Sequence, residues 1–169
     1  MRRVRYSVAM SLDGFIAGPN GEADWIVRDP DIDFAAMFRE FDAFLVGRKT
    51  YEAMQGYKGS GMGDAKVFVF SNTLHEAKGA VVSNDPAGVV AALKSEPGKD
   101  IWLFGGGVLF RSMLDQGLVD RVEVGVIPVL LGSGLPLLPE TPKRRQLVLT
   151  EHKVYPKSGI VRLAYDVAR

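Results

Sequence analysis

Cysteine is absent from the 169-residue sequence, and histidine occurs only twice. Without cysteine the chain has no disulfide framework, no thiolate nucleophile and no cysteine-based zinc or iron–sulfur site. His75 and His152 lie far apart in the sequence and lack a carboxylate cluster at ligand spacing, so they predict no metal site. We therefore expect no metal, and we expect a cytoplasmic location because nothing in the sequence requires an oxidising compartment.

A charge imbalance and a long apolar run are also missing. The 21 basic and 20 acidic residues leave a net charge of +1, which predicts neither nucleic acid nor a membrane surface as a partner. No stretch approaches the roughly eighteen uninterrupted apolar residues of a membrane-spanning helix. The length fits one domain, which we expect to span residues 1–169.

Strand and helix patterns alternate through the first two thirds of the chain. Short apolar runs predict strands at 4–10, 43–46, 66–70, 80–84, 101–104 and 121–127, and a closing hairpin around the turn at 156–159. Helices are expected at 47–54, after Asp85-Pro86, and from about 108 to 116, before Gly117. This order predicts an α/β fold with a mostly parallel sheet and a C-terminal antiparallel hairpin.

One more helix is expected after the glycine- and proline-rich segment 17–30, which we interpret as a long loop. Asp29 and Pro30 are typical N-cap and first-turn residues. The apolar residues that follow at helical spacing are Phe34, Met37, Phe38 and Phe41. The pattern predicts an amphipathic helix that starts at Asp29-Pro30 and packs on the sheet.

Two junctions between a strand and a helix have the character of ligand sites. In "FLVGRKT" a strand runs through Gly47 into Arg48, Lys49 and Thr50, and in "IWLFGGGVLF" another strand runs into residues 105–107. Open α/β sheets bind ligands beyond the carboxyl ends of their strands, where helix N-termini offer free N–H groups to anions. Glycine has no Cβ, so a diphosphate or a flat ring can approach its backbone closely.

Neither junction matches a well-known phosphate motif. A Walker A loop ending at Lys49-Thr50 would need glycine at positions 43 and 48, which are Ala43 and Arg48. A G-x-G-x-x-G motif starting at Gly105 would need a third glycine where Phe110 stands. The sequence therefore excludes a P-loop and disfavours a standard Rossmann site.

The whole chain resembles the dihydrofolate reductase superfamily, and specifically the branch that includes the reductase domain of the riboflavin-biosynthesis protein RibD. The matching segments, in order, are "SVAMSLDGFIAG", "LVGRKTYEAM", "VFVFSNT", "WLFGGGVLFRSML" and "VEVGVIPVLLGSGLPLLP". The glycine-rich segment 56–64 and the loop 128–139 are similar to the RibD branch in particular. The resemblance implies a three-layer fold and a homodimer, to which the apolar residues of 128–139 and of the tail hairpin would contribute.

The resemblance also implies a bound nicotinamide dinucleotide, which we expect to be NADPH. It assigns Gly47, Arg48 and Thr50 to the adenosine phosphates, with Arg48 as the partner of the 2′-phosphate. The remaining residues that it assigns to the cofactor are Ser71 and Asn72 at the adenosine end, Gly105, Gly106, Gly107, Val108 and Leu109 at the diphosphate, and Ala9 and Ile16 beside the nicotinamide. Residues 17–25 would form a loop over the ring. Ser71-Asn72-Thr73 is also ordinary turn chemistry, so a purely structural role stays open there.

The substrate side is less specific. Dihydrofolate reductases carry an acidic residue on the helix after that loop, which makes Asp31 and Asp33 the candidate catalytic residues. Acidic residues in the first turn of a helix also stabilise it by about 0.3–1 kcal/mol, so either could be structural instead. Gly125 stands where dihydrofolate reductases carry a threonine that binds the pterin, which disfavours folate as the substrate.

These residues predict an NADPH-dependent reductase that transfers hydride to a small pyrimidine or pterin heterocycle. The resemblance points to 5-amino-6-(5-phosphoribosylamino)uracil reductase of riboflavin biosynthesis. Two alternatives stay open: a dihydrofolate reductase proper, and a non-catalytic module that binds a nicotinamide nucleotide. The deaminase half of a bifunctional RibD needs a P-C-x-x-C motif, which a chain without cysteine does not have.

Overall fold

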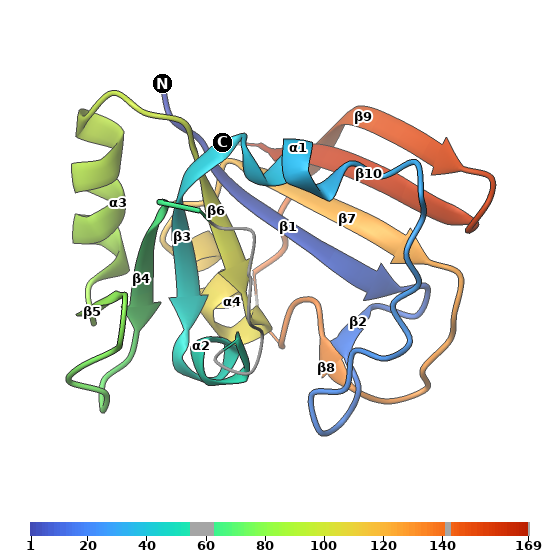
Figure 1. The fold of residues 1–169 in the computed structure, drawn as a ribbon, viewed down its shortest axis with the longest axis horizontal. Helices are drawn as coiled ribbons and strands as arrows, with labels where there is room; N and C mark the ends of the chain where they lie inside the picture. Colours follow the sequence, from blue (N-terminus) through green and yellow to red (C-terminus); the bar gives the residue numbers. More distant parts are fainter. Residues whose placement is uncertain (55–62, 141–142, 169) are drawn as a thin grey trace.

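One eight-stranded sheet forms the centre of the computed structural model, which describes residues 1–54, 63–140 and 143–168. The strand order is β5-β4-β3-β6-β1-β7-β10-β9 (Figure 1). Neighbours from β5 to β7 pair in parallel, and β10 pairs antiparallel with both β7 and β9. The strands are β1 (Val4–Ser11), β3 (Phe41–Gly47), β4 (Lys66–Phe70), β5 (Val81–Ser83), β6 (Asp100–Gly105), β7 (Arg121–Ile127), β9 (Leu147–Tyr155) and β10 (Ile160–Val167). The predicted parallel sheet with a C-terminal hairpin is confirmed.

Helices cover both faces of this sheet and make three layers. On one face α3 (Pro86–Ser95) and α4 (Gly107–Asp115) bury apolar side chains in the largest core cluster. On the other face α1 (Phe34–Phe38) packs Phe38 against an aromatic cluster of Phe41, Phe44 and Trp102. The Trp102 ring lies 5.0 Å from Phe38, 4.8 Å from Phe41 and 5.5 Å from Phe44 between ring centroids.

Local signals placed the two longest helices correctly. The Asp85 side chain accepts a hydrogen bond from the Gly88 amide at 2.9 Å, which caps α3 ahead of Pro86. The helix α4 ends before Gly117, whose φ of +70° is the left-handed conformation that glycine tolerates best. Among the described residues, no helix has the length and apolar character that crossing a membrane requires.

The helix expected to start at Asp29 is shorter than predicted, and that part of the prediction is wrong. The N-cap of α1 is Asp33, and Phe41 is the first residue of β3 rather than a helix position. Asp29 is buried and accepts hydrogen bonds from the amides of Asp31 and Ser158, at 2.9 and 3.0 Å. Its carboxylate therefore anchors the chain to the β9–β10 turn and is not available as a helix cap.

A second, two-stranded sheet was not predicted. It pairs β2 (Phe15–Ala17) antiparallel with β8 (Leu135–Pro136), at the lower right of Figure 1. Both strands are too short for an alternating pattern to identify them. The helix α2 (Arg48–Met54) begins directly at the end of β3, as expected. Most of the glycine-rich segment 56–64 falls in 55–62, outside the described residues.

Candidate functional site

The two junctions that the sequence singled out lie side by side at the carboxyl ends of neighbouring strands (Figure 1). Strand β3 ends at Gly47 and β6 ends at Gly105, and Val46 is the Cα partner of Gly105. A Cβ built on Gly47 would lie 3.6 Å from the Gly105 carbonyl oxygen and 3.8 Å from the Gly106 nitrogen. The first turns of α2 and α4 therefore border one backbone surface.

The three consecutive glycines differ in whether the local structure requires a glycine. Gly105 has a φ of +127°, a conformation that other residues rarely adopt. Gly107 packs tightly, because a Cβ there would lie 2.8 Å from the Pro136 carbonyl oxygen. Gly106 has neither constraint: its φ of −90° and ψ of −165° suit any residue, and among the described residues its missing Cβ would contact only Thr50 Oγ1, at 3.6 Å. The bare surface at Gly106 is thus not required by local packing.

The N-terminus of α4 presents backbone donors beside this surface. Gly106 is the N-cap, and it provides no side-chain hydrogen bond. The first N–H groups of a helix have no acceptor in a preceding turn, so those of Gly107, Val108 and Leu109 are free of intrahelical partners. The Val108 side chain is 76% exposed, whereas Leu109 is buried in the core. This arrangement can bind an anion such as a diphosphate.

Arg48 and the segment after β4 meet at the adjacent strand end. Arg48 is the first residue of α2, and its guanidinium donates to Thr73 Oγ1 at 3.3 Å and lies 3.7 Å from a Glu52 carboxylate oxygen. Ser71 Oγ accepts hydrogen bonds from the amides of Thr73 and Leu74, at 3.2 and 3.0 Å. The structure therefore brings Arg48 together with the turn that contains Ser71, and Asn72 lies exposed within the same turn.

The residues expected beside the nicotinamide come from β1 and β2. Ile16 lies in β2, where its neighbour Phe15 pairs with Pro136 of β8. The Pro136 carbonyl packs against Gly107, so β8 connects β2 to the glycine segment. Ala9 lies further along the sheet on β1, and both Ala9 and Ile16 are partly buried.

Asp13 fixes the loops on this side, and the sequence interpretation missed it. Its carboxylate accepts hydrogen bonds from Ser11 Oγ at 2.7 Å and from the Leu131 and Gly132 amides at 3.1 and 2.7 Å. The Ser11 hydroxyl, followed by the Leu131 amide, lowers the pKa of Asp13 to about 2. The carboxylate thereby joins the turn after β1 to the loop that leads into β8.

The two candidate catalytic carboxylates both have structural contacts. Asp33 Oδ1 accepts the Ala36 amide at 2.8 Å and caps α1. Asp31 pairs with Lys157 of the β9–β10 turn at 2.8 Å, with both side chains at least half exposed. Ile32, which lies between them, packs in the same apolar cluster as Ala9. The structure thus places this segment over the Ala9 end of β1. The contacts that it gives Asp31 and Asp33 are an exposed ion pair and a helix cap.

Comparison with known proteins identifies the family. Residues 2–161 match the family model of the RibD C-terminal domain. The chain belongs to this family. The uncharacterized protein YyaP of Bacillus subtilis (strain 168) is 35% identical over 178 residues, which cover 97% of this chain and 94% of YyaP.

Solved structures agree with this RibD C-terminal domain assignment. A protein of Shewanella sp. PV-4 provisionally assigned to riboflavin biosynthesis is 25% identical, with a TM-score of 0.86 over 100% of both chains. The dihydrofolate reductase of Enterococcus faecalis, solved with NADP(H) and RAB-propyl, has a TM-score of 0.71 at 19% identity and covers 99% of this chain and 97% of its own. The dihydrofolate reductase-like fold that the sequence predicted is therefore confirmed.

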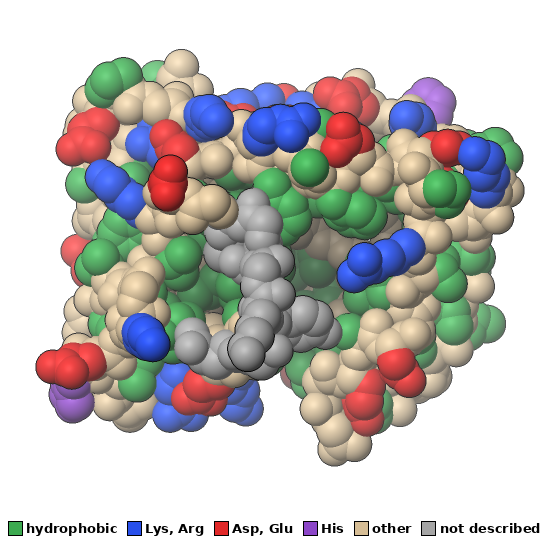
Figure 2. All heavy atoms as spheres, viewed as in Figure 1, with side chains coloured by type: hydrophobic (Ala, Val, Ile, Leu, Met, Phe, Trp, Pro, Cys, Tyr) green, Lys and Arg blue, Asp and Glu red, His purple; other side chains and the backbone are tan. Residues whose placement is uncertain are grey.

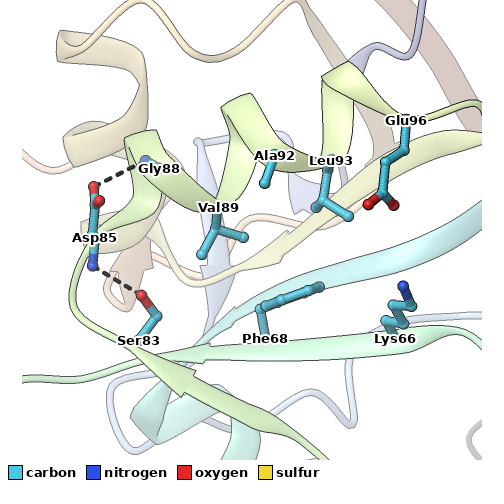
Figure 3. Close-up of a pocket in the computed structure, with 9 residues that line it drawn as sticks. All are labelled: Lys66, Phe68, Ser83, Asp85, Gly88, Val89, Ala92, Leu93 and Glu96. Carbon is cyan, nitrogen blue, oxygen red and sulfur yellow. Dashed lines mark hydrogen bonds between the residues drawn. The ribbon is translucent and has the colours of Figure 1, made fainter.

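This RibD C-terminal domain also has a groove of about 360 Å³ between β4, β5 and α3 (Figure 3). It is lined by Lys66, Phe68, Ser83, Asp85, Gly88, Val89, Ala92, Leu93 and Glu96. At one end of the groove Asp85 caps α3. Its carboxylate accepts a hydrogen bond from the Gly88 amide, and its own amide donates to Ser83 Oγ at 3.0 Å. None of the predicted cofactor or catalytic residues lines this groove, so we place the site at the strand ends instead.

In the part of the chain that the structure describes, no group of three or more His, Asp or Glu side chains is placed to hold an ion. Besides Asp13, the sequence interpretation missed two residues that bind arginine side chains: Thr73, which accepts from Arg48, and Glu123 of β7, which accepts from Arg5. Thr73 follows the predicted Ser71-Asn72 pair directly, so its position was a usable signal. Glu123 carried no signal beyond its place between valines in a strand.

Proposed function

We propose that this chain is an NADPH-dependent reductase whose residues 1–169 act as a single domain. The observation that carries the proposal is the bare backbone surface at Gly106, between the first amides of α4 and the Thr50 side chain of α2. A Cβ would fill this surface, although neither φ nor packing forbids one there. A flat or charged ligand that needs close approach to the backbone accounts for the glycine.

The residues fit a nicotinamide dinucleotide in two places. The amides of Gly107, Val108 and Leu109 would bind its diphosphate. Arg48, which is 45% exposed and joined to Thr73, would bind the 2′-phosphate that distinguishes NADPH from NADH. When bound, the nicotinamide supplies the hydride, and the chain supplies orientation and electrostatics.

Substrate contacts are proposed for the face that Ala9 and α1 share. Asp31 is the better placed of the two acidic candidates, because an exposed ion pair such as that with Lys157 contributes little and can exchange partners. Asp33 caps α1 through one of its two carboxylate oxygens, and the other oxygen would face the substrate. A carboxylate here would anchor the heterocycle or help its protonation.

The family favours a pyrimidine over a folate. The RibD C-terminal domain match and the Shewanella protein both point to riboflavin biosynthesis. The open surface at Gly125, where dihydrofolate reductases carry a pterin-binding threonine, argues in the same direction. We therefore propose 5-amino-6-(5-phosphoribosylamino)uracil, or a compound with its ring, as the first substrate to test.

A panel assay tests the proposal. NADPH oxidation is followed at 340 nm with aminopyrimidine ribosylamines, dihydrofolate and dihydrobiopterin as acceptors. We expect oxidation that depends on a pyrimidine, with lower kcat in Asp31→Asn if that carboxylate is catalytic. NADPH binding without oxidation of any acceptor would instead support a non-catalytic nucleotide-binding module. No NADPH binding would exclude both.

We further propose that the chain is cytoplasmic and forms a homodimer through its β9–β10 edge. Strand β9 is the last strand of the sheet, so no described strand pairs with its outer edge. Three of its apolar side chains are more than half exposed: Val148, Leu149 and Val154. An exposed apolar edge strand favours association with another chain.

A further inference from the structure

The sheet is open in front of Gly125, on the face that α1 covers in part. Ala9 of β1 and Gly125 of β7 are Cα partners, so two residues with little or no side chain lie next to each other. Within the described part of the chain, a Cβ built on Gly125 would meet one atom within 4 Å, a methyl carbon of Ile160 at 3.9 Å. Figure 2 shows a hollow in this face of the molecule, over β1. The hollow adjoins the expected nicotinamide position at Ala9.

The backbone at Ala9 and Gly125 forms the floor of this open region, and an arginine lies beside it. Arg162 of β10 is the Cα partner of Gly125, and paired residues on adjacent strands project from the same face. Its side chain is 34% exposed, and its Nη2 lies 3.4 Å from Glu123 Oε2. The contact with Glu123, the residue two before Gly125, confirms which face the guanidinium occupies.

Glu123 does not neutralise Arg162, because two other arginines share it. Arg5 donates to both oxygens of Glu123, at 3.0 and 3.1 Å, and Arg121 Nε lies 2.8 Å from Oε1. Glu123 is 1% exposed, and burial by itself would raise its pKa. Hydrogen bonds and charge from Arg5 outweigh burial, so the pKa of Glu123 is lowered and the group stays ionised.

The other two arginines pair with further carboxylates. Arg5 also pairs with Glu40 and Asp100, and Arg121 also pairs with Glu151 and Asp166. Within the described ranges, Glu123 is the sole carboxylate partner of Arg162, at 3.4 Å. Arg162 therefore keeps donors and positive charge for a ligand.

A second cation lies on the next strand. Lys153 of β9 is the Cα partner of Arg162, and its ammonium lies 4.7 Å from the centre of the Tyr155 ring. The stacked position on Tyr155 keeps Lys153 on the side of the sheet where Tyr155 packs with Ala9 in one cluster. The row Ala9, Gly125, Arg162 and Lys153 thus runs from a bare floor to two cations.

We propose that Arg162, supported by Lys153, binds an oxyanion carried by the heterocyclic substrate, and thereby selects phosphorylated or carboxylated rings over neutral ones. The proposal deepens the reductase function and rests on it for the identity of the ring. Glu123 is the positioning residue that holds the guanidinium at the edge of the floor. A guanidinium suits this role because its fork of donors matches phosphate and carboxylate oxygens.

The test compares rings that differ only in the anion. Binding of 5-amino-6-(ribosylamino)uracil and of its 5′-phosphate, and of uracil and orotate, is measured by calorimetry without NADPH. The proteins are the wild type, Arg162→Gln, Arg162→Lys and Arg145→Gln. Arg145 pairs with Asp115 at the end of α4, so its variant removes one charge at a distant place. Thermal melts establish that each variant is folded.

We expect the wild type to prefer the anionic member of a pair and Arg162→Gln to lose roughly ten- to a hundredfold affinity for it alone. Arg162→Lys should retain part of the preference, which keeps the test valid if the glutamine variant unfolds. Arg145→Gln should keep all of it. A preference within the ribosylaminouracil pair identifies phosphate as the anion, and one within the uracil pair identifies carboxylate.

Three results would overturn the proposal: equal binding of both members by the wild type, no binding of either, or a preference that survives in Arg162→Gln. The reductase proposal fails separately. If NADPH does not bind while the anion preference depends on Arg162, the reductase proposal is wrong and the anion site stands. If NADPH oxidation proceeds without any anion preference, only the anion site is wrong.

Discussion

Thr50 on α2 faces the backbone of Gly106 at the start of α4, with its hydroxyl oxygen 3.6 Å from the place that a Cβ would take. That distance is an ordinary van der Waals contact, so an alanine side chain fits there. One residue further on, the same atom on Gly107 would lie 2.8 Å from the carbonyl oxygen of Pro136 and 3.0 Å from Pro139. Adjacent glycines therefore differ in what they do: Gly107 permits packing, and Gly106 leaves a surface bare.

The first prediction separates these two roles by stability. Gly107→Ala should lower the free energy of unfolding by about 1–3 kcal/mol, because the backbone of β8 cannot move aside without losing its pairing with β2. Gly106→Ala should change it by no more than about 0.5 kcal/mol. Urea denaturation of the two variants measures the difference. Equal destabilisation would mean that both glycines serve packing.

Arg48 gives a prediction about cofactor choice. Replacing Arg48 by alanine should weaken NADPH binding by roughly ten- to a hundredfold, because the 2′-phosphate would lose a charge-assisted bidentate contact with the guanidinium. NADH has no 2′-phosphate and should bind almost as before. Stability should hardly change, since the exposed contact with Glu52 at 3.7 Å contributes little. The measurement is the dissociation constant of each cofactor. Equal weakening of NADPH and NADH binding would show that Arg48 does not bind the 2′-phosphate.

Asp13 gives a prediction about pH. Its pKa falls from 3.8 to about 2 in the folded chain, so the ionised form is stabilised by the fold. The carboxylate therefore stabilises the protein fully above about pH 4, and this contribution is lost as the pH falls towards about 2. Asp13→Asn should melt at a lower temperature than the wild type near neutrality. The difference in Tm should shrink below about pH 4; a constant difference down to the lowest pH would contradict this origin.

Association through the β9 edge predicts that the protein in solution has the mass of two chains. Light scattering at micromolar concentration should give about 37 kDa, twice the 18.4 kDa of one chain. Val154→Lys places a charge on the exposed edge strand and should shift the mass towards that of the monomer. A wild-type mass near that of one chain would end the homodimer proposal.

Much of this architecture followed from short-range signals. The caps at Asp85 and Gly117 and the apolar runs of the parallel strands depend on neighbouring residues, and those predictions were confirmed. The two junctions where a strand ends in glycine before a helix were also identifiable, and the structure places them at neighbouring strand ends.

The errors arose where distant residues decide the structure. Asp29 has the sequence of a helix cap, but the Ser158 amide, more than a hundred residues away, uses its carboxylate. The purpose of Gly107 depends on the Pro136 carbonyl, and the role of Glu123 depends on arginines from β1, β7 and β10. None of these contacts has a pattern within one segment that could have predicted it.

Titration of NADPH into the wild type and into Gly106→Val, by calorimetry at one temperature and salt concentration, tests the central claim most directly. The account predicts saturable binding to the wild type at one NADPH per chain. It predicts no measurable binding to Gly106→Val, whose two methyl groups would occupy the bare surface while the fold persists by thermal melt. A wild type that does not bind NADPH, or a folded Gly106→Val variant that binds it as tightly as the wild type, would contradict the account.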